Sequence, residues 1–88
     1  MTTVRGGRFI SNEEGAVLSQ ILCRDDGRLL GMIIRYDEDA PTYAWVVVGI
    51  RRDSTPDHPH YHARRLGARS TDQAARAAVE RALGEVGS

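Results

Sequence analysis

The chain has 88 residues, of which twelve are basic and twelve acidic, so its formal net charge is zero. This length fits a single domain over residues 1–88 with a modest core, and the neutral balance excludes the surplus of positive charge that drives non-specific DNA binding. A single cysteine excludes an internal disulfide, and no apolar stretch approaches the roughly 20 residues that cross a bilayer. We therefore expect a cytoplasmic protein with no membrane partner.

The first part of the chain carries the weakest pattern. Residues 5–8, Arg-Gly-Gly-Arg, are expected to form a frayed end, with a basic arm that contacts DNA as the alternative. The apolar residues at positions 17–22 recur at helical spacing, and residues 11–14 fit a helix capping box. Because the same run continues into a hairpin, we predict a strand over residues 13–23 and keep a helix as the alternative.

The clearest local signal is the pair Asp26-Gly27, which interrupts two apolar runs within residues 21–36. A tight turn needs a positive φ, and Gly27 adopts it without a steric clash at Cβ, so we predict a β-hairpin. Gly31 lies inside the second strand, where a glycine weakens pairing, and we assign it a packing role. An acidic loop follows, and Pro41 prevents the strand from continuing.

Residues 43–50 are aromatic and β-branched, a composition that predicts a well-buried, central strand. Tyr43 and Trp45 alternate with Ala44, so the two rings share one face of that strand. In a core this small we expect Trp45 to be buried. If the rings face solvent instead, they form an anchor for a partner protein.

The rest of the chain predicts a loop, an edge strand and a helix. Residues 51–59 contain two prolines and are predicted to form an exposed loop, the most mobile part of the chain, and residues 60–66 a short edge strand. Ser70 fits an N-cap and Gly84 an end signal, which together predict a helix over residues 71–83. The predicted fold class is α+β, with a three- to five-stranded antiparallel sheet packed on one C-terminal helix.

No motif in the sequence points to catalysis or to a cofactor. His58, His60 and His62 alternate as metal ligands on a strand can, but no cysteine or carboxylate ligand pattern accompanies them, so we predict no metal site. Cys23 lies in an apolar strand context and fits a small buried hydrophobe. We therefore predict a protein that is not an enzyme and needs no cofactor.

A locally basic span stands out against the neutral total. The span from His58 to Arg69 contains three arginines and no acidic residue. Arginine forks bind phosphate, and Tyr61 offers a ring on which a nucleobase can stack. The alternative interpretation is an ordinary edge strand whose arginines pair with the domain's own acids.

The chain resembles small sheet-plus-helix domains of actinobacteria and their phages. The resemblance lies in residues 26–31 (Asp-Gly-Arg-Leu-Leu-Gly), in the Trp45 strand, and in residues 69–75 (Arg-Ser-Thr-Asp-Gln-Ala-Ala), which open an Ala-rich helix. More loosely, residues 20–84 resemble the arm-type DNA-binding domain at the N-terminus of tyrosine recombinases, in which a three-stranded sheet packs on one helix and reads the major groove. This resemblance implies DNA contacts from the hairpin residues Arg24, Arg28 and Arg35.

Two hypotheses about function follow. The first is a nucleic-acid-binding accessory module of a phage or mobile element. The second is a protein-binding module that modulates or inhibits a host complex, or forms a homodimer, through its acidic loop, its aromatic strand or a sheet edge. The predicted nucleic-acid contacts are Arg24, Arg28, Arg35, Tyr61, Arg64, Arg65 and Arg69, and the predicted protein contacts are Asp37, Glu38, Asp39, Tyr43 and Trp45.

Overall fold

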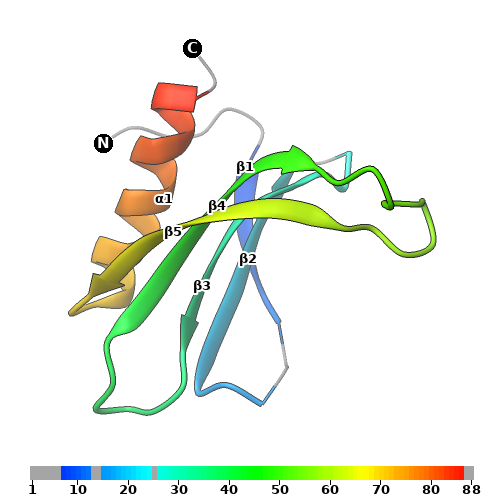
Figure 1. Cartoon of the computed structure of the whole chain (residues 1–88). Helices are drawn as coiled ribbons and strands as arrows, with labels where there is room; N and C mark the ends of the chain where they lie inside the picture. Colours follow the sequence, from blue (N-terminus) through cyan, green and yellow to red (C-terminus); the bar gives the residue numbers. More distant parts are fainter. Residues whose placement is uncertain (1–6, 13–14, 25, 87–88) are drawn as a thin grey trace.

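The computed structural model describes residues 7–12, 15–24 and 26–86. This part of the chain forms one five-stranded antiparallel sheet, with the strands in chain order, and a C-terminal helix on one face of it (Figure 1). The predicted α+β class is therefore confirmed. The elements are β1 (Gly7–Ser11), β2 (Leu18–Arg24), β3 (Leu29–Arg35), β4 (Thr42–Ile50), β5 (Tyr61–Arg69) and α1 (Asp72–Val86).

β1 and β2 form the N-terminal side of the sheet. The strand predicted over residues 13–23 is confirmed where it overlaps β2, while residues 13 and 14 lie outside the described residues. The frayed end predicted for residues 5–8 is wrong where the structure describes it, because β1 already begins at Gly7. Phe9 explains the difference, since it packs against the buried core and holds this short edge strand on the sheet.

The turn between β2 and β3 confirms the predicted hairpin. Gly27 has a φ of 81°, the positive value that the turn requires. The Gly27 N–H donates to the carbonyl of Arg24, and the Arg24 N–H donates to the carbonyl of Arg28, both at 2.9 Å. The Asp26 carboxylate adds a third bond by accepting from the Arg28 N–H at 3.0 Å. Backbone and side chain together therefore fix the register of the two strands.

β4 and β5 form a longer hairpin, and the loop between them projects beyond the other strands (Figure 1). Several polar bonds brace this loop. Among them, the Arg51 N–H donates to the His60 carbonyl at 3.0 Å, and the His60 N–H donates to the Ser54 hydroxyl oxygen at 3.0 Å. The edge strand predicted over residues 60–66 is confirmed from Tyr61 onward, and it continues to Arg69, where a turn into the helix was expected. The pairing of β4 and β5 contains a bulge at which Gly67 has a φ of 97°.

The helix differs from its prediction at both ends. The Ala74 N–H donates to the Thr71 hydroxyl oxygen at 3.1 Å, so Thr71 caps the helix and the predicted Ser70 cap is wrong. The helix also continues past Gly84 to Val86, because one glycine costs only about 1 kcal/mol in a helix. Within the described residues, no helix combines the length and the apolar character needed to cross a membrane.

Small residues let α1 lie close against the sheet. Ala44 of β4 belongs to one buried cluster with Ala75 and Val79 of α1. A Cβ built on Gly31 of β3 would lie 2.6 Å from Val79 Cγ1, closer than real Cβ atoms approach another atom. The packing role predicted for Gly31 is therefore confirmed. This close approach leaves no room for a side chain at position 31 between the helix and β3.

A polar tether fixes the start of the helix. Asp72 in the first turn of α1 accepts a hydrogen bond from the Thr42 hydroxyl at 2.8 Å, and it pairs with Arg35 Nη2 at 3.4 Å. Thr42 is 1% exposed, so its hydroxyl depends on this acceptor. A carboxylate in the first turn is also stabilised by the helix dipole. The three residues come from β3, β4 and α1, and they hold the two layers in one orientation.

Candidate functional site

The sheet face opposite α1, which we call the open face, is not covered by any element in the described part of the chain (Figure 1). Because side chains alternate along a strand, the burial of Thr42, Ala44 and Val46 toward the helix places Tyr43 and Trp45 on the open face. Trp45 is half-buried there and is not part of the core cluster. The expectation of a buried Trp45 is therefore wrong.

An apolar row crosses the open face from edge to edge. Residues directly opposite in antiparallel strands share a face. Ile10 of β1 lies opposite Ile21 of β2, Ile21 lies opposite Met32 of β3, and Met32 lies opposite Trp45 of β4. Trp45 in turn lies opposite Arg65 of β5, which places a cation at the end of the row.

Arg65 covers the two aromatic rings of the open face. Its Cζ lies 4.8 Å from the centre of the Tyr43 ring and 5.8 Å from that of Trp45. A guanidinium at this distance is attracted by the negative face of a ring, and it can itself stack on a planar group. The three side chains thus form one platform on β4 and β5, which we call the Tyr43–Trp45–Arg65 platform.

Charge is distributed unevenly between the sheet and the rest of the fold. The five strands contain six arginines and no aspartate or glutamate. All twelve acidic residues of the chain therefore lie in other segments. The neutral total conceals a sheet that carries only positive side-chain charge.

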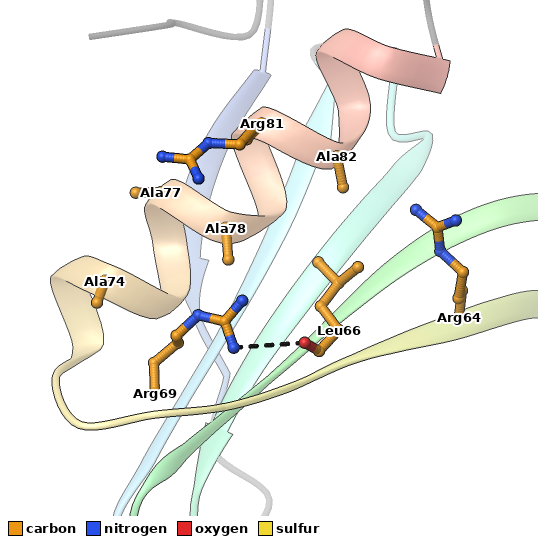
Figure 2. Close-up of a pocket in the computed structure, with 8 residues that line it drawn as sticks. All are labelled: Arg64, Leu66, Arg69, Ala74, Ala77, Ala78, Arg81 and Ala82. Carbon is orange, nitrogen blue, oxygen red and sulfur yellow. Dashed lines mark hydrogen bonds between the residues drawn. The ribbon is translucent and has the colours of Figure 1, made fainter.

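A hollow lies on the helix side of β5, between that strand and α1. It has a volume of about 360 Å³ and an apolar floor formed by Leu66 and by alanines of the helix. Arg64 and Arg69 reach it from β5, and Arg81 reaches it from α1 (Figure 2). We call this hollow the arginine groove. Its lining residues are Arg64, Leu66, Arg69, Ala74, Ala77, Ala78, Arg81 and Ala82.

The structure does not bring all the predicted nucleic-acid contacts to one surface. Arg65 belongs to the platform, whereas Arg64 and Arg69 line the arginine groove on the other side of the same strand. Arg35 pairs with Asp72, and Tyr61 lies half-buried where β5 begins. The two remaining residues, Arg24 and Arg28, are exposed at the turn between β2 and β3.

The predicted protein contacts separate into two places. Tyr43 and Trp45 lie on the open face, but Asp37, Glu38 and Asp39 form an exposed loop at the end of the sheet where β3 leads into β4. Within that loop, the Asp39 N–H donates to the Asp37 carboxylate at 3.4 Å. The loop therefore borders the open face at its Tyr43 end.

The histidines and the cysteine form no metal-binding group among the described residues. His58 and His60 lie in the loop before β5, whereas His62 lies within that strand. No group of three histidine, cysteine or acidic side chains among the described residues could hold a metal ion. Cys23 is half-buried on β2, opposite Arg8 of β1 and Leu29 of β3.

Sequence reasoning missed part of both surfaces. Met32 and Ile21 belong to the apolar row, yet a hairpin strand that is apolar on both faces gives no sign of which side chains meet the helix. Arg81 lies on the helix at a position that looks like ordinary solvent exposure, and only the three-dimensional structure brings it near Arg64 and Arg69. The strand composition was an available signal, because the acids avoid every strand.

Comparisons of the chain with protein-family models, with curated proteins and with solved structures gave no match. The resemblance to recombinase arm domains therefore stays a prediction.

Proposed function

We propose that this protein is a non-catalytic module that binds single-stranded nucleic acid on the open face of its sheet. The observation that carries the proposal is the Tyr43–Trp45–Arg65 platform, in which one guanidinium lies over two rings on an uncovered face. Aromatic rings on a sheet surface stack on nucleobases of any sequence, and arginine contributes both stacking and an ion pair with phosphate.

The charge of the face supports a polyanionic partner. Arg65 and Arg8 lie on the two edge strands, and no acidic residue occurs in any strand. A phosphate backbone crossing the sheet thus meets arginines at both edges and no repulsive side chain from the strands. Phosphate contacts of this kind give an affinity that falls steeply with salt.

The shape of the platform favours single strands over a duplex. A base stacks on a ring only when its own face is free, and the bases of a duplex are already stacked on one another. Tyr43 and Trp45 are two residues apart on β4, so they lie about 7 Å apart along the strand. At this spacing each ring receives one unstacked base when the Arg65 guanidinium moves from the rings to a phosphate.

Trp45 is the only tryptophan of the chain, and it therefore serves as a built-in probe. We expect its fluorescence to be quenched when oligothymidylate is added at low salt. The affinity should fall between about 50 mM and 200 mM salt, because counterions compete for the arginines. A duplex of the same length should bind more weakly.

Matched variants locate the contact. Tyr43→Ala removes one stacking ring and should weaken binding about tenfold, while Trp45 still reports it, since one base–ring stack contributes roughly 1–3 kcal/mol. Arg65→Gln should weaken binding and reduce the salt dependence. Arg76→Gln, at a residue whose Cζ lies 4.5 Å from the Phe9 ring centre on the helix side, should leave binding unchanged. Absence of quenching at DNA concentrations of about 10⁻⁴ M, the weak end of non-specific binding, would contradict the proposal.

The second candidate function is docking of a protein, and the row from Ile10 to Trp45 favours it. Ile10 is 44% exposed, and a continuous apolar row is typical of an interface core with a polar rim. The face spans about 24 Å across five strands and about 23 Å along seven residues, so it covers about 500 Å² per partner. A dimer of this size reaches only the lower end of stable interfaces.

Two copies packed through the open face would also bring like charges together, because Arg8 and Arg65 recur on both. This is why nucleic acid is the first proposal. Native mass spectrometry separates the alternatives: a dimer in the wild type that becomes monomeric in Met32→Glu, together with no response of Trp45 to DNA, supports protein docking instead.

A further inference from the structure

We infer that the arginine groove between β5 and α1 is a binding site for phosphoryl groups, distinct from the platform on the open face. The ligand chemistry is a phosphate, carried either by a free nucleotide or by the backbone of a nucleic acid. The first observation is the hollow itself, which has a volume of about 360 Å³ and is lined by three arginines. Cavities of this size hold small ligands in other proteins.

The hollow exists because small residues line it. α1 packs on the sheet through Ala75, Val79 and Ala82, which are at most 5% exposed. The flank of the helix that faces β5 carries Ala74, Ala77 and Ala78, which are too short to reach the strand. In Figure 2, Ala78 and Ala82 point toward the space above Leu66, and neither fills it.

The charges around the groove have one sign. In the described part of the chain, its lining includes Arg64, Arg69 and Arg81 and no acidic residue. Among the described side chains, the ion pairs involve Arg35 and Arg51, so no carboxylate is paired with the three groove arginines there. Guanidinium groups gathered around one hollow repel one another unless an anion lies among them. The groove therefore favours an anionic occupant.

Arg69 is held in place before any ligand arrives. Its Nη1 donates to the carbonyl of Ala68 at 3.0 Å and to the carbonyl of Leu66 at 3.4 Å. The two carbonyls flank Gly67, whose φ is 97°, and Figure 2 shows the guanidinium rising from β5 into the groove. An immobilised guanidinium loses little entropy on binding, and its planar fork matches two phosphate oxygens.

The groove and the platform share strand β5. Arg64 and Arg65 are neighbours in the chain, so their side chains point to opposite faces of this edge strand. A single strand of nucleic acid that passes over the edge of β5 can place bases on the platform and a phosphate in the groove. This connection rests on the proposed function, whereas the phosphate site itself does not.

The test uses three probes on the full chain: inorganic phosphate, thymidine monophosphate and labelled oligothymidylate. The variants are Arg69→Gln, which removes the held guanidinium, and Ala78→Leu, which fills the groove and keeps every charge. Arg76→Gln is the control for loss of one positive charge elsewhere on α1. Circular dichroism melts confirm that each variant is folded, and Ala78→Leu keeps the test valid if Arg69→Gln is unstable.

Binding of phosphate or the mononucleotide to the wild type and Arg76→Gln, weakened about tenfold in Arg69→Gln and Ala78→Leu, supports the site. Weaker oligothymidylate binding in these two variants also supports the site. In Arg69→Gln, the slope of log affinity against log salt concentration should be smaller by about 0.7 per lost phosphate contact. If Arg69→Gln and Ala78→Leu bind every probe as tightly as Arg76→Gln does, the inference is overturned. If Trp45 never responds but phosphate binding depends on Arg69, the proposed function fails and the phosphate site stands.

Discussion

Gly31→Ala is the substitution that most directly tests how α1 lies on the sheet. The new Cβ would lie 2.6 Å from Val79 Cγ1 and 2.8 Å from the Trp45 carbonyl oxygen. Val79 is fully buried and β-branched, so its side chain has one strongly preferred rotamer in a helix and little freedom to move away. The carbonyl belongs to the backbone of β4 and moves only with the strand. The Val79 contact must therefore be relieved by moving the helix away from the sheet, and the carbonyl contact by moving β4 relative to β3.

The cost follows from two opposing effects. An extra methyl group in a packed core costs typically about 1–3 kcal/mol, and two contacts that cannot yield place this site in the upper half of that range. Replacing glycine reduces the entropy of the unfolded chain and returns about 0.4–1 kcal/mol. We therefore expect a net loss of about 1–2 kcal/mol in the free energy of unfolding. For a domain of this size, such a loss lowers Tm by roughly 5–15 °C.

Thermal and urea unfolding followed by circular dichroism measure this loss. Gly84→Ala is the matched control, because nothing lies within 4 Å of a Cβ there and alanine is preferred in a helix. It should raise stability by up to about 1 kcal/mol. Combining Gly31→Ala with Val79→Ala should cost less than the sum of the two single changes, since one contact disappears. A Tm for Gly31→Ala equal to that of the wild type refutes the close packing of α1 over β3.

Two further substitutions test the tether and the turn. Asp72→Ala leaves the buried Thr42 hydroxyl without its acceptor and should cost about 1–2 kcal/mol in unfolding free energy. Asp72→Asn keeps an acceptor and should cost less. Equal losses for the two variants in urea unfolding would show that the charge matters and the hydrogen bond does not. Gly27→Ala places a Cβ at a φ of 81° and should lower the free energy of unfolding by about 1 kcal/mol. Gly27→Asn should lie closer to the wild type, because asparagine tolerates this conformation. An unchanged urea midpoint for Gly27→Ala would contradict the assigned turn.

The elements set by local chemistry could be predicted from the sequence. The Asp26-Gly27 turn needs only a residue that adopts positive φ between two apolar runs, and the helix follows from its alanine-rich stripe. β1 was missed because its one core residue, Phe9, stands in a short polar segment and is recognisable only once β2 lies beside it. The Ser70 cap was misplaced by one residue, because Thr71 offers the same chemistry.

The face on which Trp45 lies could not be predicted from the pattern of its own strand. β4 is apolar at almost every position, so alternation gives no direction. The direction is set by α1, which packs closely on Gly31 and Ala44. The larger residues buried beside them, Ile33 and Val46, are still smaller than the rings of Tyr43 and Trp45, which lie on the other face. A rule that places the largest apolar side chain in the core fails here, because the fully buried apolar residues of the described chain are aliphatic and include no aromatic ring.

The neutral net charge of the whole chain does not describe the charge at the two proposed binding surfaces. A sum over the chain treats every acid as if it opposed every arginine, but screening in physiological salt limits such effects to about 8 Å for exposed groups. The acids of the loop at residues 37–39 lie at one end of the sheet, whereas Arg64 and Arg65 lie opposite Val46 and Trp45, further along β4. A nucleic acid at the β5 edge therefore meets a local positive field. The acidic loop in turn disfavours its extension past Tyr43, and Asp37→Asn should strengthen binding only for strands long enough to reach that end.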